Sequence, residues 1–559
     1  MTLSTPSMDP VTTIAQNFYK APLPHITLEF VELASLTSKS VSRLVATLGE
    51  GTRLGIAASY GEKCVLETLA FSTAIRVLFI MVRGDTVGTS RQKKILREEL
   101  LCNVSLEKHG FFMERIAASL YLDLGLYIRN AFDIASAGDK RGSMAAYKGV
   151  LVRAQTLLSL NERVVERTFA EQPFILSRID DFALRAWACY IGVQAFPDSP
   201  GAIDTSAKNM EELRWMCKCV RDADRSDALK PHFTENDVSA DFNINGGAVD
   251  LQCTRFKTRI RRSDNQHIRL KTDQGEFKGH VKNVSGRDVK VASHTQIASN
   301  AKIRSVVTIG KDELNGAGTT RAILILDAFR DGDALISSPF VRKIFFPDYP
   351  LHTLKWPKLP QTLPKINFTY RQLNASQKKA VEKCLSNEEE DRHVVIVGPP
   401  GTGKTTVIAA AVQSKVAEHP SNTVWVVAHS NVAVKNIAEK LVECGFLDFR
   451  LLVSKDFHHG WHEHLYEAIS SRMIESGDFK HTTLDNERLV LGVRVMLCTI
   501  SMLSTGRLMQ CGFTKVVPVQ TVIIDEASQI EVGDYLPILA RYKTSLRKIV
   551  FIGDNKQRG

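Results

Sequence analysis

The spacing of apolar and polar residues changes along the chain, and its last third has the clearest pattern. From about residue 369 to 559, short runs rich in Val and Ile alternate with helical stretches. Such near-continuous apolar runs are typical of strands buried on both faces of a parallel sheet. The expected strands are Val394–Val397, Val424–Ala428, Val495–Thr499, Thr521–Ile524 and Ile549–Ile552. We therefore predict an α/β domain over residues 369–559.

The front of the chain has a weaker pattern. Residues 1–22 are predicted to form a flexible tail, and residues 23–200 an α/β domain in which Arg76–Val82 suits a buried strand. Polar and acidic residues dominate residues 201–250 around one expected helix, Met210–Val220. That stretch is predicted to connect two domains.

A third pattern, alternation with period two, begins at about residue 251. It is rich in Val, Ile and Thr, continues to residue 347 and predicts a small β-barrel, with apolar strand residues of Arg321–Phe346 completing it. Five prolines then follow, Pro347 and four more within residues 348–368, and each proline fixes its own φ and restricts the preceding residue. We expect a stiff linker there.

Composition and charge narrow the class of protein. With 44% hydrophobic and 24% charged residues, the chain is near the globular average, which excludes global disorder or a fibrous repeat. The net charge of +11 suits a protein that meets a phosphate backbone, although a merely basic surface gives the same value. The ten cysteines lack paired zinc-site spacing. Without a signal peptide or an apolar run of ~20 residues, we expect a nuclear or cytoplasmic protein that does not enter a membrane.

The strongest chemical signal is a glycine-rich loop between an expected strand and an expected helix. Glycines let backbone N–H groups curl around phosphates, and the helix N-terminus adds its positive end. Lys404 is predicted to reach the β- and γ-phosphates of ATP, and the Thr405 hydroxyl to bind Mg²⁺. The predicted nucleotide-binding residues are Gly398, Pro399, Pro400, Gly401, Thr402, Gly403, Lys404, Thr405 and Thr406.

A phosphate loop needs a carboxylate at the end of a nearby strand to hold the metal. Asp525 follows the apolar run Val522–Ile524 and is predicted to bind Mg²⁺ together with Thr405. The adjacent Glu526 can orient and polarise the attacking water. We expect ATP hydrolysis at this pair.

Four further motifs accompany the phosphate loop and the Asp525–Glu526 pair: Leu373–Gln377, Ala428–Val434, Cys498–Thr499 and Gly553–Gln557. In this order the series resembles helicase superfamily 1, in particular the family of the nonsense-mediated-decay, senataxin-type and immunoglobulin switch-region binding helicases. The resemblance implies a RecA-like motor domain in which Gln377 reads the adenine edge. It implies that Ser430, Asn431 and Thr499 contact nucleic-acid phosphates, and that Gln557 couples the γ-phosphate to the nucleic-acid groove.

The resemblance also shows departures. His429 stands where the family usually has Pro, and Lys435 where it has an acidic residue, so the details of strand contact differ. The family's second RecA-like domain, which supplies an arginine finger, does not follow within these 559 residues. We expect the chain to represent the ATP-binding half of such a motor.

Alternating cations mark the start of the expected barrel. Arg255, Lys257, Arg259 and Arg261 would share one face of a strand. That face is either plainly solvated or a groove that follows a nucleic-acid backbone. The resembling family places a β-barrel over the bound strand, which favours the groove.

The first domain resembles the ribonuclease D-type 3′–5′ exonucleases, which have an RNase H-like fold, through Leu54–Ser59, Thr68–Phe71, Val77–Ile80 and Ala131–Ala135. Those enzymes hold two metal ions with four carboxylates. Here Ala57 and Ser59 stand at two of the carboxylate positions, Ser177 stands where Tyr or His is expected, and only Asp133 and Asp181 remain. We predict a degenerate exonuclease-like domain without nuclease activity; an unrelated α/β domain is the alternative.

Together these patterns predict an α/β protein that uses ATP and Mg²⁺ to act on single-stranded RNA or DNA as a superfamily 1 helicase or translocase. The alternative is a non-catalytic regulatory protein that binds ATP and nucleic acid. Neither the choice between RNA and DNA, the direction of movement nor the protein partners follow from the residues.

Overall fold

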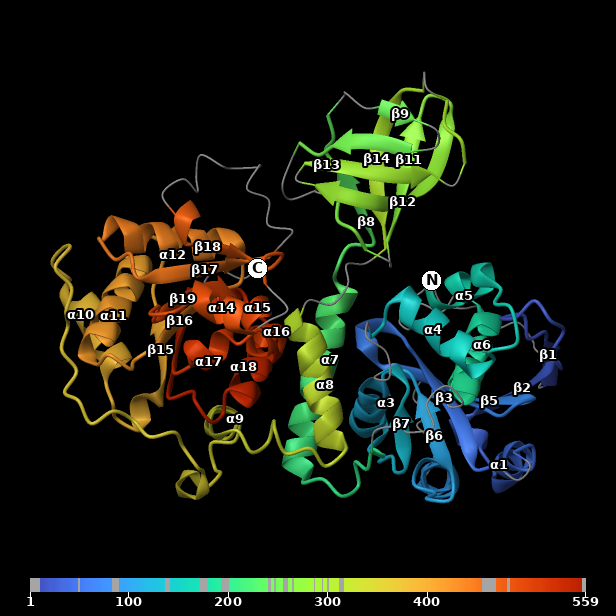
Figure 1. Ribbon diagram of the computed structural model, residues 1–559. Coiled ribbons are helices and arrows are strands. Elements are labelled where there is room, and N and C mark those ends of the chain that lie inside the picture. The colour runs from blue at the N-terminus through green and yellow to red at the C-terminus, as the bar shows by residue number, and fades with distance from the viewer. Residues whose placement is uncertain are drawn as a thin grey trace.

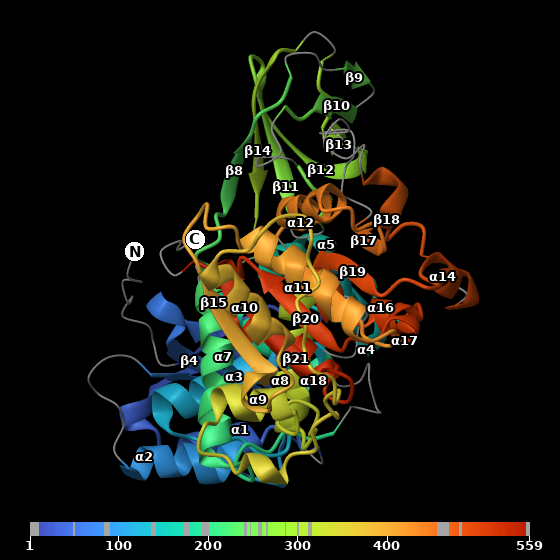
Figure 2. The same cartoon turned by 90° about the vertical axis from the view of Figure 1, so that its left-hand side faces the viewer.

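The computed structural model shows an N-terminal α/β domain, a central layer of helices, a β-barrel that projects from this layer, and a C-terminal α/β motor domain (Figure 1). The same arrangement is seen edge-on in Figure 2. The structure describes residues 11–48, 51–82, 90–135, 141–170, 178–192, 201–239, 243–245, 248–254, 260–263, 266–285, 287–293, 295–298, 301–310, 316–454, 469–479 and 483–554.

The N-terminal domain is a mixed sheet with helices on both faces. Its strands lie in the order β1-β2-β5-β4-β3-β6-β7, in which β4 is antiparallel to both neighbours and β6 and β7 are parallel to β3. The strands are β1 (Val11–Ile14), β2 (Ile26–Glu32), β3 (Arg53–Tyr60), β4 (Leu66–Ser72), β5 (Arg76–Met81), β6 (Glu107–Gly110) and β7 (Ala131–Asp133). The helices are α1 (Ser38–Val45), α2 (Ser90–Ile95), α3 (Met113–Ser119), α4 (Met144–Ala154), α5 (Glu162–Ala170) and α6 (Ile179–Gly192). The predicted α/β domain is confirmed, and its resemblance to exonucleases stays a prediction.

The predicted N-terminal tail is wrong for its second half. Strand β1 pairs with β2, and Phe18 and Tyr19 are buried against Trp187 of α6. The Tyr19 hydroxyl also donates to the carbonyl of Leu151 in α4, at 2.7 Å. Residues 11–22 therefore belong to the domain, because burial of two aromatic rings outweighs the cost of ordering a short segment.

The central layer consists of α7 (Met210–Ala228), α8 (Gly316–Phe329) and α9 (Pro339–Phe345). It corrects two predictions. Residues 201–250 are not a simple connector, since α7 packs on the N-terminal domain and the following residues already enter the barrel. Arg321–Phe346 forms no barrel strands but the helices α8 and α9; in α8, Ala317, Arg321, Ile325 and Phe329 are buried at helical spacing.

The β-barrel is formed by antiparallel strands in the order β8-β14-β11-β12-β13-β10-β9. The strands are β8 (Phe233–Asn236), β9 (Asn243–Asn245), β10 (Ala248–Gln252), β11 (His267–Thr272), β12 (Gly275–Ser285), β13 (Asp288–Ser293) and β14 (Ile303–Ile309). The ring closes where the chain after β8 pairs with the chain after β10, since Ser239 N–H donates to Gln252 and Thr254 N–H to Asp237. The predicted barrel is confirmed, but it spans about 233–309 rather than 251–347.

The motor domain contains a sheet whose described strands are all parallel, in the order β15-β21-β20-β16-β19-β17-β18. The strands are β15 (His393–Val397), β16 (Val424–Ala428), β17 (Phe449–Val453), β18 (Met473–Glu475), β19 (Val495–Thr499), β20 (Thr521–Asp525) and β21 (Lys548–Gly553). The helices are α10 (Ala375–Leu385), α11 (Lys404–Glu418), α12 (Asn431–Glu443), α14 (Thr483–Leu489), α15 (Ile500–Ser504), α16 (Arg507–Gln510), α17 (Phe513–Val516) and α18 (Leu536–Arg541). All five predicted strands are confirmed.

One strand departs from the expected burial on both faces. In β15, Val395 and Val397 are 66% and 59% exposed, whereas β16 is buried throughout. Strand β15 pairs with β21 alone among the described strands, so it lies at the sheet edge, where the helices on that face do not cover it. A Val-rich run predicts a strand but not its place in the sheet.

A single apolar core joins the N-terminal domain, the central layer and the motor domain. It includes Ile116 of α3, Leu326 of α8, Phe340 of α9 and Leu539 of α18. The Ser338 hydroxyl, just before α9, donates to the carbonyl of Leu539 at 2.7 Å in the buried interface. The two α/β domains are therefore packed together through α8 and α9.

Candidate nucleotide and nucleic-acid site

The predicted site residues converge on one edge of the motor sheet. The phosphate loop follows β15, Asp554 follows β21, Asp525 ends β20, Ser430 follows β16 and Thr499 ends β19. These five strands are neighbours in the sheet and parallel, so their carboxyl ends lie side by side. In open parallel sheets, ligands bind at this edge. Motifs that lie far apart in the sequence are therefore neighbours along one edge of the sheet.

The phosphate loop adopts a backbone that only glycine accommodates easily. Gly401 and Gly403 have φ of +79° and +84°, in the left-handed region. The 15-residue helix α11 begins at Lys404, directly after Gly403, so its N-terminal N–H groups and its dipole face the loop. Lys404 Nζ lies across the loop and donates to the carbonyls of Gly398 and Pro399, at 2.7 and 3.2 Å. The ammonium of Lys404 therefore lies within the loop, where it can bind a phosphate.

Asp525 ends β20 and Glu526 follows it, and one strand, β21, separates β20 from β15, the strand before the phosphate loop. Asp525 is buried, and its Oδ1 accepts the N–H of Glu526 at 2.9 Å. Burial raises the pKa of Asp525 above its ordinary value, and the nearby positive charge of Lys404 opposes this rise. Glu526 has φ of +52°, a left-handed conformation that is costly for a residue with a side chain. Such strain is found at functional sites, which suits the role predicted for Glu526.

The strand between them, β21, contacts the loop after Glu526. The N–H of Asp554 donates to Ser528 Oγ at 3.3 Å, and a Cβ on Gly553 would lie 3.0 Å from the Ser528 nitrogen. This close approach explains the glycine at position 553. Gln557, the predicted coupling residue, lies outside the described residues, so its role stays a prediction.

Gln377 contacts the phosphate loop from α10. Its Oε1 accepts the N–H of Asn374, as part of a capping box at the start of α10, and its Nε2 donates to the carbonyl of Thr402 at 3.0 Å. Gln377 is thus brought to the nucleotide loop as predicted, while its contact with adenine stays a prediction. Sequence reasoning missed Arg371, whose Nη2 donates to Thr406 Oγ1 at 2.8 Å. Its one signal is a cation close before the Gln377 motif.

The predicted strand-contacting residues also have local structural roles. Ser430 Oγ accepts the N–H of Ala433 and caps α12, and Thr499 Oγ1 accepts the N–H of Met502 and caps α15. Asn431 is the first residue of α12 and is half-buried. Helix N-termini that face the site edge offer backbone N–H groups to phosphates. Capping and phosphate contact are compatible at these positions.

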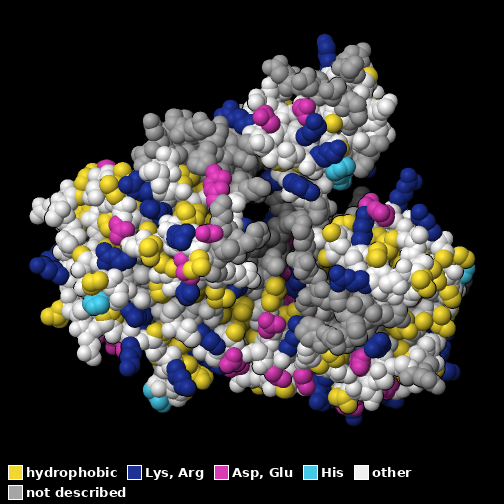
Figure 3. Space-filling model, viewed as in Figure 1, with side chains coloured by type: hydrophobic (Ala, Val, Ile, Leu, Met, Phe, Trp, Pro, Cys, Tyr) yellow, Lys and Arg dark blue, Asp and Glu magenta, His cyan; other side chains and the backbone are white. Residues whose placement is uncertain are grey.

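Most of the predicted barrel cations fall outside the described residues: Arg255, Lys257 and Arg259. Arg261 is described and is exposed. The described barrel surface carries further cations that the sequence analysis did not select, namely Arg269, Lys271, Lys278, Lys282 and Lys290 on β11, β12 and β13. Figure 3 shows several Lys and Arg side chains on the barrel.

Three of these five cations lie within 4 Å of a carboxylate: Arg269 and Lys271 beside Glu276, and Lys290 beside Asp250. Arg269 and Lys278 are direct cross-strand partners, an unfavourable placement of like charges that a bound polyanion would relieve. Lys278 and Lys282 form no ion pair with another described residue, whereas Lys271 lies 3.6 Å from Glu276. The barrel therefore has a cationic surface, at strands other than those predicted.

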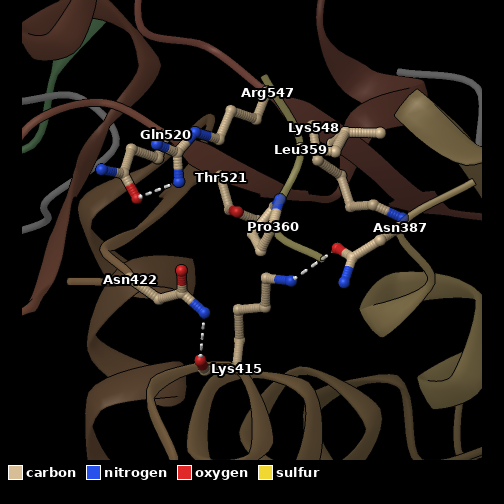
Figure 4. Close-up of a pocket in the computed structure, with 9 residues that line it drawn as sticks. All are labelled: Leu359, Pro360, Asn387, Lys415, Asn422, Gln520, Thr521, Arg547 and Lys548. Atoms are coloured by element: carbon tan, nitrogen blue, oxygen red, sulfur yellow. Dashed lines mark hydrogen bonds between the residues drawn. The ribbon is translucent and has the colours of Figure 1, made fainter. Parts of the chain in front are cut away.

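A small polar cavity lies at the opposite edge of the motor sheet, before β16, β20 and β21 (Figure 4). Its volume of about 10 Å³ is enough for roughly one water molecule. Its cations are already paired: Lys548 donates to the carbonyl of Lys383 at 2.8 Å, and Lys415 lies 2.6 Å from Glu418. This cavity is not a second nucleotide site.

The two carboxylates that the exonuclease resemblance leaves in the first domain, Asp133 and Asp181, have arginine partners. Asp133 is buried and lies 3.2 Å from Arg141, which also forms two hydrogen bonds with Glu114. Burial alone would lower the pKa of Arg141, but these two carboxylates outweigh it and raise the pKa. Asp181 accepts a hydrogen bond from Arg167 at 3.0 Å. Both remaining carboxylates are thus engaged by arginines.

No group of three or more His, Cys, Asp or Glu side chains suited to a metal occurs among the residues that the structure describes. Within the same residues, no helix combines the length and apolar character needed to span a bilayer.

The fold and the site define a phosphate-loop nucleotide-binding domain of the RecA-like type. An AAA domain family model matches residues 372–559. Over 220, 211 and 265 residues, respectively, the chain is 28% identical to a putative ATP-dependent RNA helicase, ECM32, of Saccharomyces cerevisiae, to regulator of nonsense transcripts 1 of Caenorhabditis elegans and to the ATP-dependent helicase upf1 of Schizosaccharomyces pombe. The matches cover 34%, 34% and 42% of this chain.

The motor domain of this chain is therefore similar in sequence to helicases that include a regulator of nonsense transcripts. The matched region spans only 19%, 18% and 27% of those relatives' own lengths. Among solved structures, the UvsW helicase of bacteriophage T4 is 13% identical to this chain, with a TM-score of 0.23. The match covers 34% of this chain and 56% of the UvsW chain. So low a score carries no argument.

Proposed function

We propose that this chain binds MgATP at the carboxyl edge of the motor sheet and couples its hydrolysis to the binding of single-stranded RNA or DNA. The observation that carries the proposal is the juxtaposition of the phosphate loop, at the end of β15, with Asp525 and Glu526, at the end of β20. Thr405 and Asp525 would hold Mg²⁺, which would neutralise charge on the β- and γ-phosphates.

The protein's own groups then have separate tasks. The N–H groups at the start of α11 and the ammonium of Lys404 bind and orient the phosphates. Glu526 orients the attacking water and accepts its proton. The edge that continues over β16 and β19, with Ser430 and Thr499, lies beside this centre and supports phosphate contacts of a nucleic-acid strand. The cationic barrel surface supplies a second contact region.

Two substitutions test the site. Lys404→Ala is expected to abolish or severely weaken MgATP binding, because it removes the cation aimed at the β- and γ-phosphates. Glu526→Gln is expected to leave binding intact and suppress hydrolysis, because an amide cannot accept the water's proton. Lys378→Ala, an exposed lysine on α10, is the matched control.

Calorimetry measures MgATP binding, and steady-state turnover with and without single-stranded RNA or DNA measures coupling. Unchanged MgATP affinity in Lys404→Ala would contradict the site assignment. Binding without any turnover in the wild-type chain would favour the regulatory alternative, a protein that binds ATP and nucleic acid without catalysis.

A further inference from the structure

Helix α8 contacts the motor domain at the loop that follows Glu526. This loop comprises the turns Ala527–Gln529 and Val532–Tyr535, which follow β20. Arg321 of α8 is only 6% exposed, and its guanidinium forms ion pairs with Glu531 and with Asp534, the latter at 3.1 Å. A buried arginine from a helix outside the motor sheet thus binds two carboxylates of the catalytic loop.

The fit between α8 and the loop is tight. A Cβ on Gly533 would lie 2.7 Å from Arg321 Cδ and 2.9 Å from Nη1, so only glycine leaves room for the guanidinium. Glu531 also accepts the N–H of Gly533 at 2.9 Å, which fixes the turn in which its carboxylate meets Arg321. The ion pairs and the turn therefore depend on one another.

A continuous set of contacts leads from these ion pairs to Glu526. Tyr535, next to Asp534, donates its hydroxyl hydrogen to the carbonyl of Ala527 at 2.7 Å. Its ring packs edge-on against Phe551 of β21, with the ring centroids 5.1 Å apart. Ala527 directly follows Glu526, whose left-handed backbone needs support from its surroundings. Arg321 thus fixes the loop at Glu531 and Asp534, and the Tyr535 hydroxyl fixes it at Ala527, next to Glu526.

Helix α8 is also the segment that returns from the barrel to the motor domain. The last barrel strand, β14, ends at Ile309, and α8 begins at Gly316. The N–H of Gly316 donates to Ser501 Oγ of α15 at 3.2 Å, two residues after Thr499, so the start of α8 is bonded to the motor domain. Figure 1 shows α8 beside α7, between the N-terminal domain and the motor domain and below the barrel. The barrel is thus joined to the helical layer by α7 before β8 and by α8 after β14, and of these two helices α8 is the one that carries Arg321.

We propose that Arg321 is a positioning residue for ATP hydrolysis, which holds the loop carrying Glu526 in its working conformation and links that loop to the barrel through α8. The inference rests on the proposed ATPase function. Arg321 touches neither nucleotide nor water. It acts through Glu531, Asp534 and the Tyr535–Ala527 hydrogen bond, so its loss displaces Glu526 without removing a nucleotide ligand.

The test compares Arg321→Ala with the wild-type full chain and with two further variants. Arg321→Lys keeps the charge and should restore part of the activity. Arg342→Ala is the matched control, because Arg342 is similarly buried and forms an ion pair of 2.7 Å with Glu212 between α9 and α7, away from the catalytic loop. Thermal unfolding of all four proteins separates loss of folding from loss of positioning.

Arg321→Ala is expected to lower kcat, measured with single-stranded nucleic acid, by about 10- to 100-fold, since small misplacements of a catalytic group have effects of this size. The KM for ATP should stay close to the wild-type value. Hydrogen exchange of residues 526–535 should become faster in Arg321→Ala but not in Arg342→Ala.

Wild-type kcat and wild-type exchange in Arg321→Ala would overturn the inference and leave the proposed function intact. An equal fall of kcat in Arg342→Ala would also overturn it, because general destabilisation would then explain the loss. If the wild-type chain binds MgATP but never hydrolyses it, the proposed function fails, and the exchange comparison alone decides whether Arg321 orders the loop.

Discussion

Replacing Gly403 by Ala tests the geometry of the phosphate loop and of Gln377 together. A Cβ at Gly403 would lie 2.5 Å from Gln377 Nε2, a distance that real Cβ contacts do not show. Gln377 cannot swing away freely, because its side chain caps α10 and binds the carbonyl of Thr402. The substitution therefore breaks both of these interactions in addition to straining the loop.

The expected cost follows from three contributions. A left-handed backbone costs an L-residue roughly 1–2 kcal/mol. Loss of a helix cap costs about 1 kcal/mol, and loss of a hydrogen bond contributes about 1 kcal/mol. The total for Gly403→Ala is therefore about 3–4 kcal/mol. If the loop relaxes in the free protein, this total appears as weaker MgATP binding, by about 100-fold or more at 1.4 kcal/mol per tenfold.

Gly401→Ala and Gly445→Ala are the matched controls. Gly401 has φ of +79° with no atom within 4 Å of an added Cβ, so it pays only the backbone cost, roughly 1–2 kcal/mol. Gly445, after α12, has φ of +74° and equally open space, but lies outside the phosphate loop. It should lose similar stability and keep wild-type affinity.

The assay combines urea unfolding with calorimetric MgATP titration, and the two free-energy changes are added for each variant. The sum for Gly403→Ala should exceed that for Gly401→Ala by about 2 kcal/mol, the part contributed by Gln377. Equal sums would refute the placement of Gln377 against the loop.

Two further predictions concern the other domains. Arg141→Ala should cost about 3–5 kcal/mol of stability in urea unfolding, because it leaves the carboxylates of Asp133 and Glu114 buried without a partner. The wild-type chain should not digest labelled single strands with Mg²⁺ or Mn²⁺, because Ala57 and Ser59 cannot bind a metal ion. Digestion would contradict this prediction. Replacing Lys278 and Lys282 together by Ser should weaken single-strand binding regardless of sequence. The slope of log binding constant against log salt concentration should become shallower by about 0.7 for each lost phosphate contact. An unaltered slope in binding titrations would show that these lysines do not contact the strand.

The phosphate loop and the Asp525–Glu526 pair could be predicted because each is a contiguous strand–loop unit whose chemistry depends on adjacent residues. The five strands of the motor sheet could be predicted for the same reason, since each is a short, isolated apolar run. The exposure of Val395 could not, because the position of β15 in the sheet depends on strand order and not on its own sequence.

The central layer was mispredicted because its apolar run fits two periodicities. Ile323-Leu324-Ile325-Leu326 reads equally well as a strand, and only the packing of both faces of α8 makes it a helix. The role of Arg321 was not visible at all, since its partners Glu531 and Asp534 lie 210 and 213 residues further along the chain. Contacts over such separations leave no local pattern.

The apolar core shared by the two α/β domains also bears on how this chain can change over evolutionary time. Where domains are tethered by a polar linker, each can be exchanged, duplicated or lost without regard to the other. Here Leu326 and Phe340 pack within one core that also contains Ile116 and Leu539, so the N-terminal domain and the motor share their tolerance to mutation. The N-terminal domain can persist under selection whatever its own activity, because its removal would expose the apolar surface of its neighbour.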